Sequence, residues 1–424
     1  MVTVDQIKEG IKKHKSELPR HQKNYNYYIG KHDILNRKLP DSEKPNNKIV
    51  TNYPRTVIDT TVGYYASKPI SYVSKSQDQN YLSDLNNAFF MNDEEDLNAE
   101  IAKNNGIFGK CYEVHWIDKN GNQRFTQYSP LEMYVEKDSK DNIKYAFRYW
   151  TEEVKDKKVT KVEAYGDDGI YYFTSDDGKE FSLDPNEQKK NHYFGEIPVV
   201  IHKNNDEELG DFESEIPMID NVNKLLSDSS NSIEAWVNAY LVLAGYKGTD
   251  SEDIKKMKQD GVLLLDDVGQ AKFLTKEADG DFQQTFFEAL DNLIHEHTAT
   301  PKLTSEKFAS NLSGVAIKFK LFSLEAKCSV KERKMSKALR KRIRLITKIL
   351  NLKGKAYNPS EIRFQFSRNI PQNEAEITDQ IVKLSDKVDD ETLLSWHPRI
   401  QDPKQVIQKR NEEQDSMNLD RDVT

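Results

Sequence analysis

The residue types that most often carry chemistry form no catalytic pattern in this chain. Three Gly-Lys pairs begin at Gly109, Gly178 and Gly354, but each lacks the earlier glycine and the following Ser or Thr of a phosphate-binding loop. Ser, His and Asp are all present, yet the sharp turn that exposes a nucleophilic serine is missing. The sequence therefore gives no support for an enzyme.

Two patterns resemble metal sites only in part. His295 and His297 are two residues apart and point to different faces of a helix, whereas zinc ligands on a helix need a spacing of four. Residues 118–122, DKNGN, resemble the start of a calcium loop, but no Glu follows at the required place, which favours a hairpin turn. Cys111 and Cys328 are typical of two buried thiols. We expect neither a metal nor a cofactor.

A dense group of positive charges is the strongest candidate for a binding function. Residues 315–353 contain thirteen Lys or Arg, two acidic residues and no Pro or Gly, in a chain whose net charge is −8. One continuous helix of this length would span roughly 55 to 60 Å, which is more than a compact domain needs. The helix is either a solvated face or a surface for a polyanion or an acidic neighbour.

Two more long helices are predicted before this one. Residues 212–245 and 281–303 carry apolar residues at spacings of three and four, in the second case Phe282, Phe286, Leu290, Leu293 and Ile294. The insert 246–280, with a short helix and two strands, is too small for a core of its own, so its neighbours must stabilise it. Pro301 ends or kinks the second helix, and the polar loop 304–314 follows.

The rest of the chain predicts an α+β fold. Val4–Tyr28 reads as an amphipathic helix, further helices begin near Pro54 and at Gln79, and residues 110–200 alternate in the manner of an antiparallel meander. A strand at 361–371 and short helices follow, with a net charge of −6 after residue 371. Because no window of about 18 apolar residues occurs, we expect a soluble intracellular protein and no membrane partner.

The order of these elements resembles that of the portal (head-tail connector) proteins of tailed bacteriophages, of the siphophage type found with Gram-positive hosts. The stretches that carry the resemblance are 212–243, FESEIPMIDNVNKLLSDSSNSIEAWVNAYLVL; 261–267, GVLLLDD; and 300–325, TPKLTSEKFASNLSGVAIKFKLFSLE. Residues 47–72, NKIVTNYPRTVIDTTVGYYASKPISY, also match the N-terminal pattern. The likeness covers about residues 5 to 410, and the ordered combination is more specific than any single stretch.

The resemblance implies a portal fold with defined regions. It places an α/β wing at 1–211, a stem helix at 212–245, a clip at 246–280 and a returning stem helix at 281–303. A tunnel loop at 304–314, a long wing helix with a strand at 315–371, and a short crown and tail at 372–424 complete the chain. The short crown is a departure from longer relatives.

The same resemblance implies a ring, most often of twelve subunits, at one capsid vertex of the virion, assembled in the host cytoplasm. Double-stranded DNA would pass through it without sequence-specific contacts. The implied partners are the large terminase subunit, a head-completion adaptor, and the major capsid and scaffolding proteins. The expected clip contacts for terminase or adaptor are Lys255, Lys256, Lys258, Asp266 and Asp267.

Further site residues follow for the tunnel. The tunnel loop would present Thr304, Ser305, Glu306, Lys307, Asn311 and Ser313. The inner surface of the basic helix would present Lys318, Lys320, Arg340 and Arg344, although basic residues spread all round this helix predict a main role in subunit contacts, with acidic segments such as 206–220 as partners. The alternative is a sequence-independent nucleic-acid-binding protein that uses 315–353 as its binding face. An enzyme with scattered catalytic residues is the third hypothesis.

Overall fold

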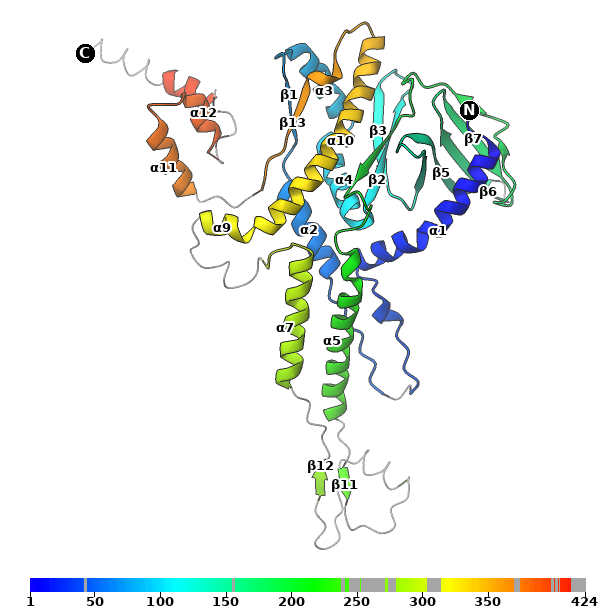
Figure 1. Cartoon of the computed structure of the whole chain (residues 1–424), viewed down its shortest axis with the longest axis vertical. Helices are drawn as coiled ribbons and strands as arrows, with labels where there is room; N and C mark the ends of the chain where they lie inside the picture. Colours follow the sequence, from blue (N-terminus) through cyan, green and yellow to red (C-terminus); the bar gives the residue numbers. More distant parts are fainter. Residues whose placement is uncertain are drawn as a thin grey trace, which may run out of the picture. The chain divides into compact units, whose positions relative to one another are not determined.

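The computed structural model divides the chain into two compact units. The first comprises Met1–Pro301 and Leu324–Ser367, and the second comprises Lys302–Ser323 and Arg368–Thr424. The residues that the structure describes are 1–41, 44–154, 157–237, 241–243, 252, 271–273, 280–302, 314–369, 374–397, 400, 403 and 405–412. Helices and antiparallel strands are mixed in the first unit, which confirms the predicted α+β fold (Figure 1).

Helix α1 (Val4–Tyr28) packs against the larger sheet of the first unit (Figure 1). Ile7 and Ile11, one turn apart on one face of the helix, are buried beside Phe147 of the sheet. Gly10 permits this approach, since a Cβ at that position would lie 2.4 Å from a ring carbon of Phe147. The predicted amphipathic helix is confirmed.

The predicted meander is also confirmed. One antiparallel sheet joins, in chain order, β4 (Met133–Lys137), β5 (Ile143–Val154), β6 (Lys157–Tyr165), β7 (Ile170–Ser175) and β8 (Ser182–Leu183), while β9 (Lys189–Lys190) pairs with β7. A second sheet has the order β10 (Val199–Lys203), β2 (Lys110–Ile117) and β3 (Gln123–Tyr128). The side chain of Asp118 accepts the amides of Asn120 and Asn122 at 2.9 Å, so residues 118–122 form a hairpin turn.

Three helices precede β2 in the chain: α2 (Tyr53–Tyr65), α3 (Gln79–Phe90) and α4 (Glu94–Phe108). The helix that the sequence predicts from Gln79 ends at Phe90, and α4 follows as a second helix, because Asn92 leaves the helix to bond β3. Its side-chain oxygen accepts the amide of Phe125 at 2.9 Å, and the next residue, Asp93, has a left-handed φ of 47° that a continuous helix does not contain. Between α2 and α3, β1 (Ser71–Ser74) pairs with β13 (Ile362–Gln365).

The remaining elements of the first unit are η1 (Asp33–Asn36), η2 (Glu213–Glu215), α5 (Ile216–Val237), β11 (Leu241–Leu243), β12 (Ala271–Phe273), α7 (Gly280–His297) and η3 (Pro359–Glu361). The predicted helix 212–245 is too long, because β11 pairs with β12 in an antiparallel ladder. The backbone of Leu241–Leu243 makes sheet hydrogen bonds there in place of helical ones. The predicted strand at 261–267 lies outside the described residues.

The predicted single helix 315–353 is two helices, α9 (Gly314–Lys320) and α10 (Phe322–Leu352), separated at Leu321. Neither Pro nor Gly marks the division. Packing explains it, because tertiary contacts stabilise a helix more than intrinsic propensity does. From Leu324 onward α10 packs in the core of the first unit, whereas α9 belongs to the second.

The second unit also contains α11 (Glu374–Leu384) and α12 (Asp390–Ser395). Asp389 caps α12, its side chain accepting the amide of Thr392 at 2.9 Å. Arg410, farther along the chain, donates to Asp390 at 2.6 Å. Short helices after the strand at 362–365 agree with the prediction from the sequence.

Arg342 on α10 is fully buried and joins three elements of the first unit. Its guanidinium donates to both carboxylate oxygens of Glu113 on β2 at 2.6 to 3.0 Å, and to Glu94 on α4 at 2.9 Å. His115 and His202 also lie within 2.9 Å of the Glu113 carboxylate. Burial, the largest effect, raises the pKa of Glu113, but the charge of Arg342 and the hydrogen bonds with His115 and His202 together outweigh burial and hold the pKa well below its usual range. The carboxylate is therefore ionised at neutral pH.

We predict that Arg342→Met lowers the free energy of unfolding by about 3 to 5 kcal/mol, because the Glu113 carboxylate stays buried without its counter-ion. Arg344→Met is the matched control. Arg344 pairs with Glu196, but its side chain is half exposed, so the loss should stay within about 1 kcal/mol. Urea unfolding at pH 7 and one fixed protein concentration measures both. Equal losses for the two variants would contradict the account.

Candidate functional site

Helices α5 and α7 form a hairpin that projects from the α/β body of the first unit (Figure 1). Near the body, Ile219 and Val222 of α5 share an apolar cluster with Leu290 and Ile294 of α7. Farther out, Ser229 of α5 donates to the side-chain oxygen of Gln283 on α7 at 3.2 Å. The two helices are thus antiparallel. Their contacts are apolar near the body and polar farther out.

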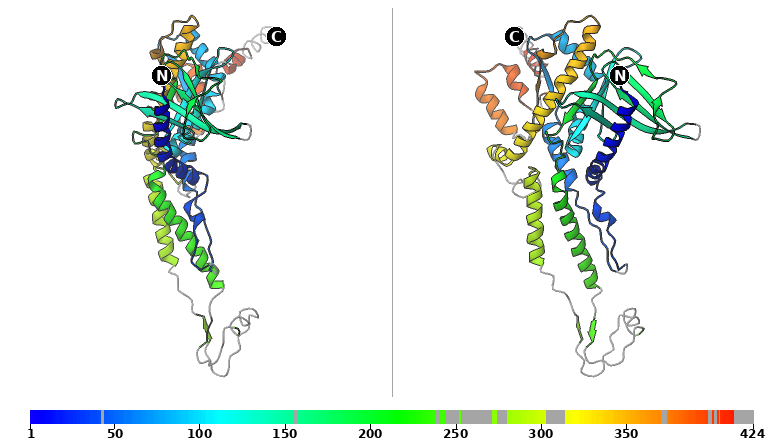
Figure 2. Two further views of the ribbon diagram at one scale, coloured as in Figure 1. Left: turned by 90° about the vertical axis from the view of Figure 1, so that its right-hand side faces the viewer. Right: turned by 45° about the vertical axis from the view of Figure 1, so that its right-hand side comes forward.

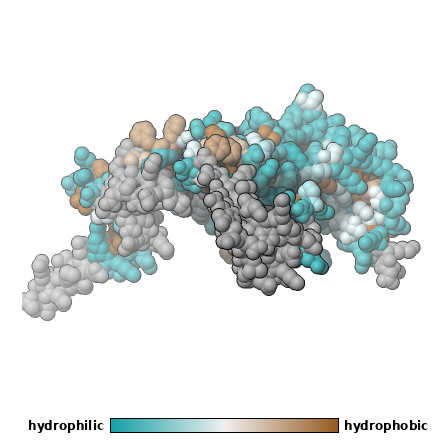
Figure 3. Space-filling view, turned by 90° about the horizontal axis from the view of Figure 1, so that it is seen from below, coloured by the Kyte–Doolittle hydropathy of each residue, from teal (hydrophilic) through white to brown (hydrophobic). Residues whose placement is uncertain are grey.

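The apolar residues of α7 form two rows instead of the one stripe that the sequence predicts. The inner row, Leu290 and Ile294, is buried. The outer row has the spacing of a coiled-coil seam, with steps of four, three and four residues, and every member is exposed. It consists of Phe282 (66% exposed), Phe286 (43%), Ala289 and Leu293 (39%). Seen from below, brown apolar surface interrupts the teal surface beside the grey atoms (Figure 3). Among the described residues, this row is the exposed apolar side of α7.

A segment that precedes α2 lies along α5. We call its described residues, 31–41 and 44–52, the arm. Thr51, Ile49 and Asn47 donate their backbone amides to the side chains of Asn223, Ser227 and Asn231, at 2.8, 2.9 and 2.7 Å. These acceptors are four residues apart on one face of α5, and the donors are two residues apart in an extended chain. Every second amide from Asn47 to Thr51 is therefore bonded to α5.

Two repeat lengths make this ladder possible. Four residues of helix advance about 6 Å along the axis, and two residues of extended chain advance about 6.5 Å. Asn223 is fully buried and also donates to His32 at 2.8 Å, while Arg37 donates to Asp228 at 2.7 Å. The arm is thus fixed along the hairpin on the side of α5 away from α7 (Figures 1 and 2).

The inward basic residues of α10 are held by acidic partners of the same chain. Lys331 is buried and donates to Asp211 at 2.7 Å, and Lys334 donates to Asp206 at 2.5 Å. Lys327 lies 3.7 Å from the Asp211 carboxylate. Asp206 and Asp211 of segment 206–220 thus pair with the basic helix within one chain, while the predicted contacts between subunits stay a prediction.

The outward basic residues of α10 form one exposed row, Arg333, Lys337, Arg340, Arg344 and Lys348. Successive members are three or four residues apart, so they share one face over about 22 Å. Arg344 also donates twice to Glu196, at 2.7 and 2.8 Å. The charges do spread all round the helix, as the sequence predicts, because Lys331 and Arg342 point into the unit, but these five residues share one exposed face.

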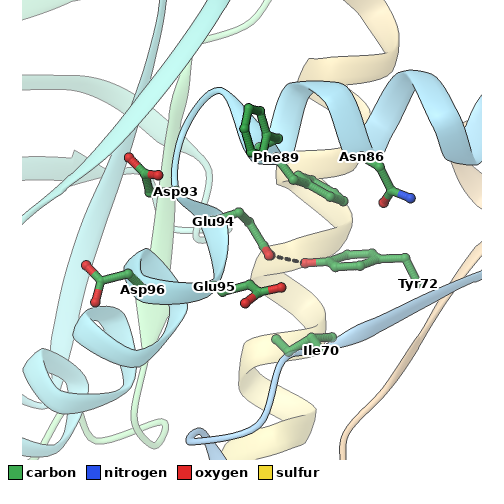
Figure 4. Close-up of a pocket in the computed structure, with 9 residues that line it drawn as sticks. Ile70, Tyr72, Asn86, Phe89, Asp93, Glu94, Glu95 and Asp96 are labelled. Carbon is green, nitrogen blue, oxygen red and sulfur yellow. Dashed lines mark hydrogen bonds between the residues drawn. The ribbon is translucent and has the colours of Figure 1, made fainter. Parts of the chain in front are cut away.

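A pocket of about 590 Å³ opens where β1, α3 and α4 meet (Figure 4). Glu94 and Tyr72 point toward one another across it, and the Tyr72 hydroxyl donates to the carboxylate. The same Glu94 oxygen accepts from Arg342, so its charge is already matched. Asp93 and Glu95 are exposed at the rim. The pocket's central polar groups hold β1 to α4 and form no arrangement of nucleophile and base.

The structure separates the site residues that the sequence predicts. Arg340 and Arg344 lie together in the exposed row of the first unit, whereas Lys318 and Lys320 are exposed on α9 of the second. The predicted clip contacts and the whole tunnel loop 304–313 lie outside the described residues. Sequence reasoning missed the arm, whose only signal is the spacing of Asn223, Ser227 and Asn231 by four.

No group of three or more metal-binding side chains occurs in the described ranges. Cys111 and Cys328 are both buried and form no disulfide, as the sequence predicts. None of the helices in the described parts of the chain combines the length and apolar character needed to cross a bilayer. The surface features that the described residues do show are the outer row of α7, the arm and the basic row of α10.

Comparison with known proteins gives one consistent similarity. The family model described as phage portal protein, SPP1 Gp6-like, matches residues 7–418. The portal protein of Bacillus phage SPP1 is 23% identical, with 96% of this chain and 83% of the relative covered. The portal protein of Clostridium phage phiCD119 is also 23% identical, with 90% of this chain and 89% of the relative covered. The similarity extends over both units.

We predict that Asn223→Ala or Ser227→Ala releases the arm while the hairpin keeps its fold. Loss of one buried hydrogen bond costs about 1 to 2 kcal/mol, or roughly five- to thirtyfold faster local opening. Hydrogen exchange at the Thr51 and Ile49 amides should rise accordingly. Ser232→Ala is the control, because this exposed hydroxyl bonds only its own helix, at the Asp228 carbonyl. Unchanged exchange in both ladder variants would count against a role for the ladder.

Proposed function

The chain belongs to the SPP1 Gp6-like family of phage portal proteins, and from that premise we propose that it forms a closed ring at one capsid vertex. Double-stranded DNA would enter the capsid through the ring during packaging and leave through it at ejection. A portal role and a place in the virion follow from the family. The number of subunits, which we propose to be twelve, and the passage of DNA go beyond what the family shows and belong to our proposal.

The observation that carries this proposal is the outer row of α7. Phe282 and Phe286 stack with parallel rings 6.2 Å apart and remain largely exposed at the free end of a projecting hairpin. A seam of this spacing is what one helix presents to another. A ring supplies a neighbour for every hairpin and leaves no seam uncovered.

We assign the regions of the ring as follows. The α/β body with α10 forms the wing, α5 and α7 form the stem, and residues 246–280 form the clip that meets the large terminase subunit and later the head-completion adaptor. Residues 304–314 form the tunnel loop, and 372–424 a short crown facing the capsid interior. The loop carries only two charges, Glu306 and Lys307, which suits weak contacts with the phosphates of moving DNA.

A second candidate function, binding of nucleic acid by the basic row of α10, has one observation in its favour. The five cations share one face over about 22 Å, a geometry suited to a run of phosphates. Such binding by a small oligomer would weaken steeply with salt, whereas a conduit needs only weak contacts. A catalytic role is not part of either proposal, and the family is structural.

Microscopy of the purified protein tests the ring directly. We expect closed rings in negative stain and a matching mass in native mass spectrometry, whereas monomers at all salt concentrations would sink the proposal. Phe282→Ser with Phe286→Ser should break the rings, since burying each phenyl ring contributes about 1.5 to 3 kcal/mol. Phe90→Ser is the control, because Phe90 is 86% exposed on the body, away from the hairpin. Rings that survive the double substitution would exclude the outer row as the contact.

A further inference from the structure

We propose that the outer row of α7 in one subunit packs against the arm of the next subunit, so that copies join head to tail. This inference rests on the proposed ring and names the two surfaces that build it. The hairpin has two unlike sides, with α7 on one and the arm on the other (Figures 1 and 2). A ring requires two different, complementary surfaces on each copy, and these sides meet that requirement.

The arm offers apolar surface for this contact. Leu35 is 40% exposed and Ile49 is 37% exposed, although both belong to a segment that is bonded firmly to α5. The Lys48 ammonium donates to the Leu35 carbonyl at 2.7 Å, which holds the two segments of the arm, 31–41 and 44–52, together. The arm is therefore a prearranged surface, and packing against it requires little further ordering of the chain.

Charge complementarity selects the arm as the partner of α7. Helix α7 carries four acidic residues, Asp281, Glu288, Asp291 and Glu296, and neither Lys nor Arg. Residues 31–52 carry five basic residues, Lys31, Arg37, Lys38, Lys44 and Lys48, against Asp33, Asp41 and Glu43. Contact between α7 and the arm brings opposite charges together, whereas two α7 helices in contact would bring together two acidic helices that have neither Lys nor Arg.

The hydrogen bonds also give the register of the contact. Ile49 is bonded to Ser227, and Gln283 is bonded to Ser229 on the same turn of α5. Phe286 follows Gln283 by about one turn of α7, so Ile49 and Phe286 lie at nearly the same height along the hairpin. Rotation about a ring axis preserves height. For a hairpin that runs along the axis, Phe286 of one copy therefore meets Ile49 of the next.

Cysteine cross-linking of the full-length protein tests this pairing. The native Cys111 and Cys328 are both buried, so they contribute little background. We expect Ile49→Cys with Phe286→Cys in one chain to give a ladder of covalent oligomers under mild oxidation or with a short bismaleimide. Each single variant should give none, and a mixture of the two single variants should give dimers only. Leu35→Cys with Phe286→Cys is a second pair, in case the first disturbs assembly.

The matched control is Asn221→Cys with Phe286→Cys, because Asn221 is exposed on the polar outer face of α5. Microscopy before oxidation shows whether each variant assembles. Rings without a ladder for both arm pairs would overturn this inference and leave the proposed ring intact. Dimers from Phe286→Cys alone would overturn it in favour of a contact between two α7 helices. The absence of oligomers, in the unmodified protein as well, would overturn both proposals.

Discussion

The ion pair between Arg342 and Glu113 is the contact on which the body of the protein depends. It joins the long helix α10 to β2, and through Glu94 to α4, among buried side chains. A buried guanidinium is costly unless its donors are matched, so the pair fixes where α10 lies along the sheet. Lys331 and Asp211 form a second buried ion pair, about three turns before Arg342 on α10. Contacts within the single chain therefore fix the position of α10 in the body.

The hairpin follows the opposite design. The base of the hairpin is buried in the apolar cluster of the body, but the outer row of α7 remains exposed. The arm reinforces α5, because side chains of α5 accept hydrogen bonds from the extended backbone of the arm. A rigid body that carries an incomplete hairpin is well suited to assembly. In the proposed ring, the hairpin would gain its remaining contacts only when copies meet.

Much of the fold could be predicted because apolar residues recur along its helices and strands at the spacing that is typical of each. Helix α1 and the meander behave as their patterns indicate. The division at Leu321 could not be predicted, since packing rather than Pro or Gly determines it. The helical spacing of apolar residues also predicts one stripe on α7 where the structure has two rows, because spacing shows which residues are apolar and not what each of them contacts. Likewise, nothing in the sequence distinguishes buried Arg342 from exposed Arg340, since both belong to one charged run and their acidic partners lie far away in the chain.

The central claim is that neighbouring subunits cover the outer row of α7. Hydroxyl-radical footprinting of the purified assembly, read by mass spectrometry and compared with the dissociated protein, tests it without any substitution. In the single chain Phe282, Phe286 and Phe90 are 66%, 43% and 86% exposed. The account predicts that assembly protects Phe282 and Phe286 while Phe90 stays reactive. Oxidation of Phe282 and Phe286 at the same rates in the assembled and dissociated protein would contradict it.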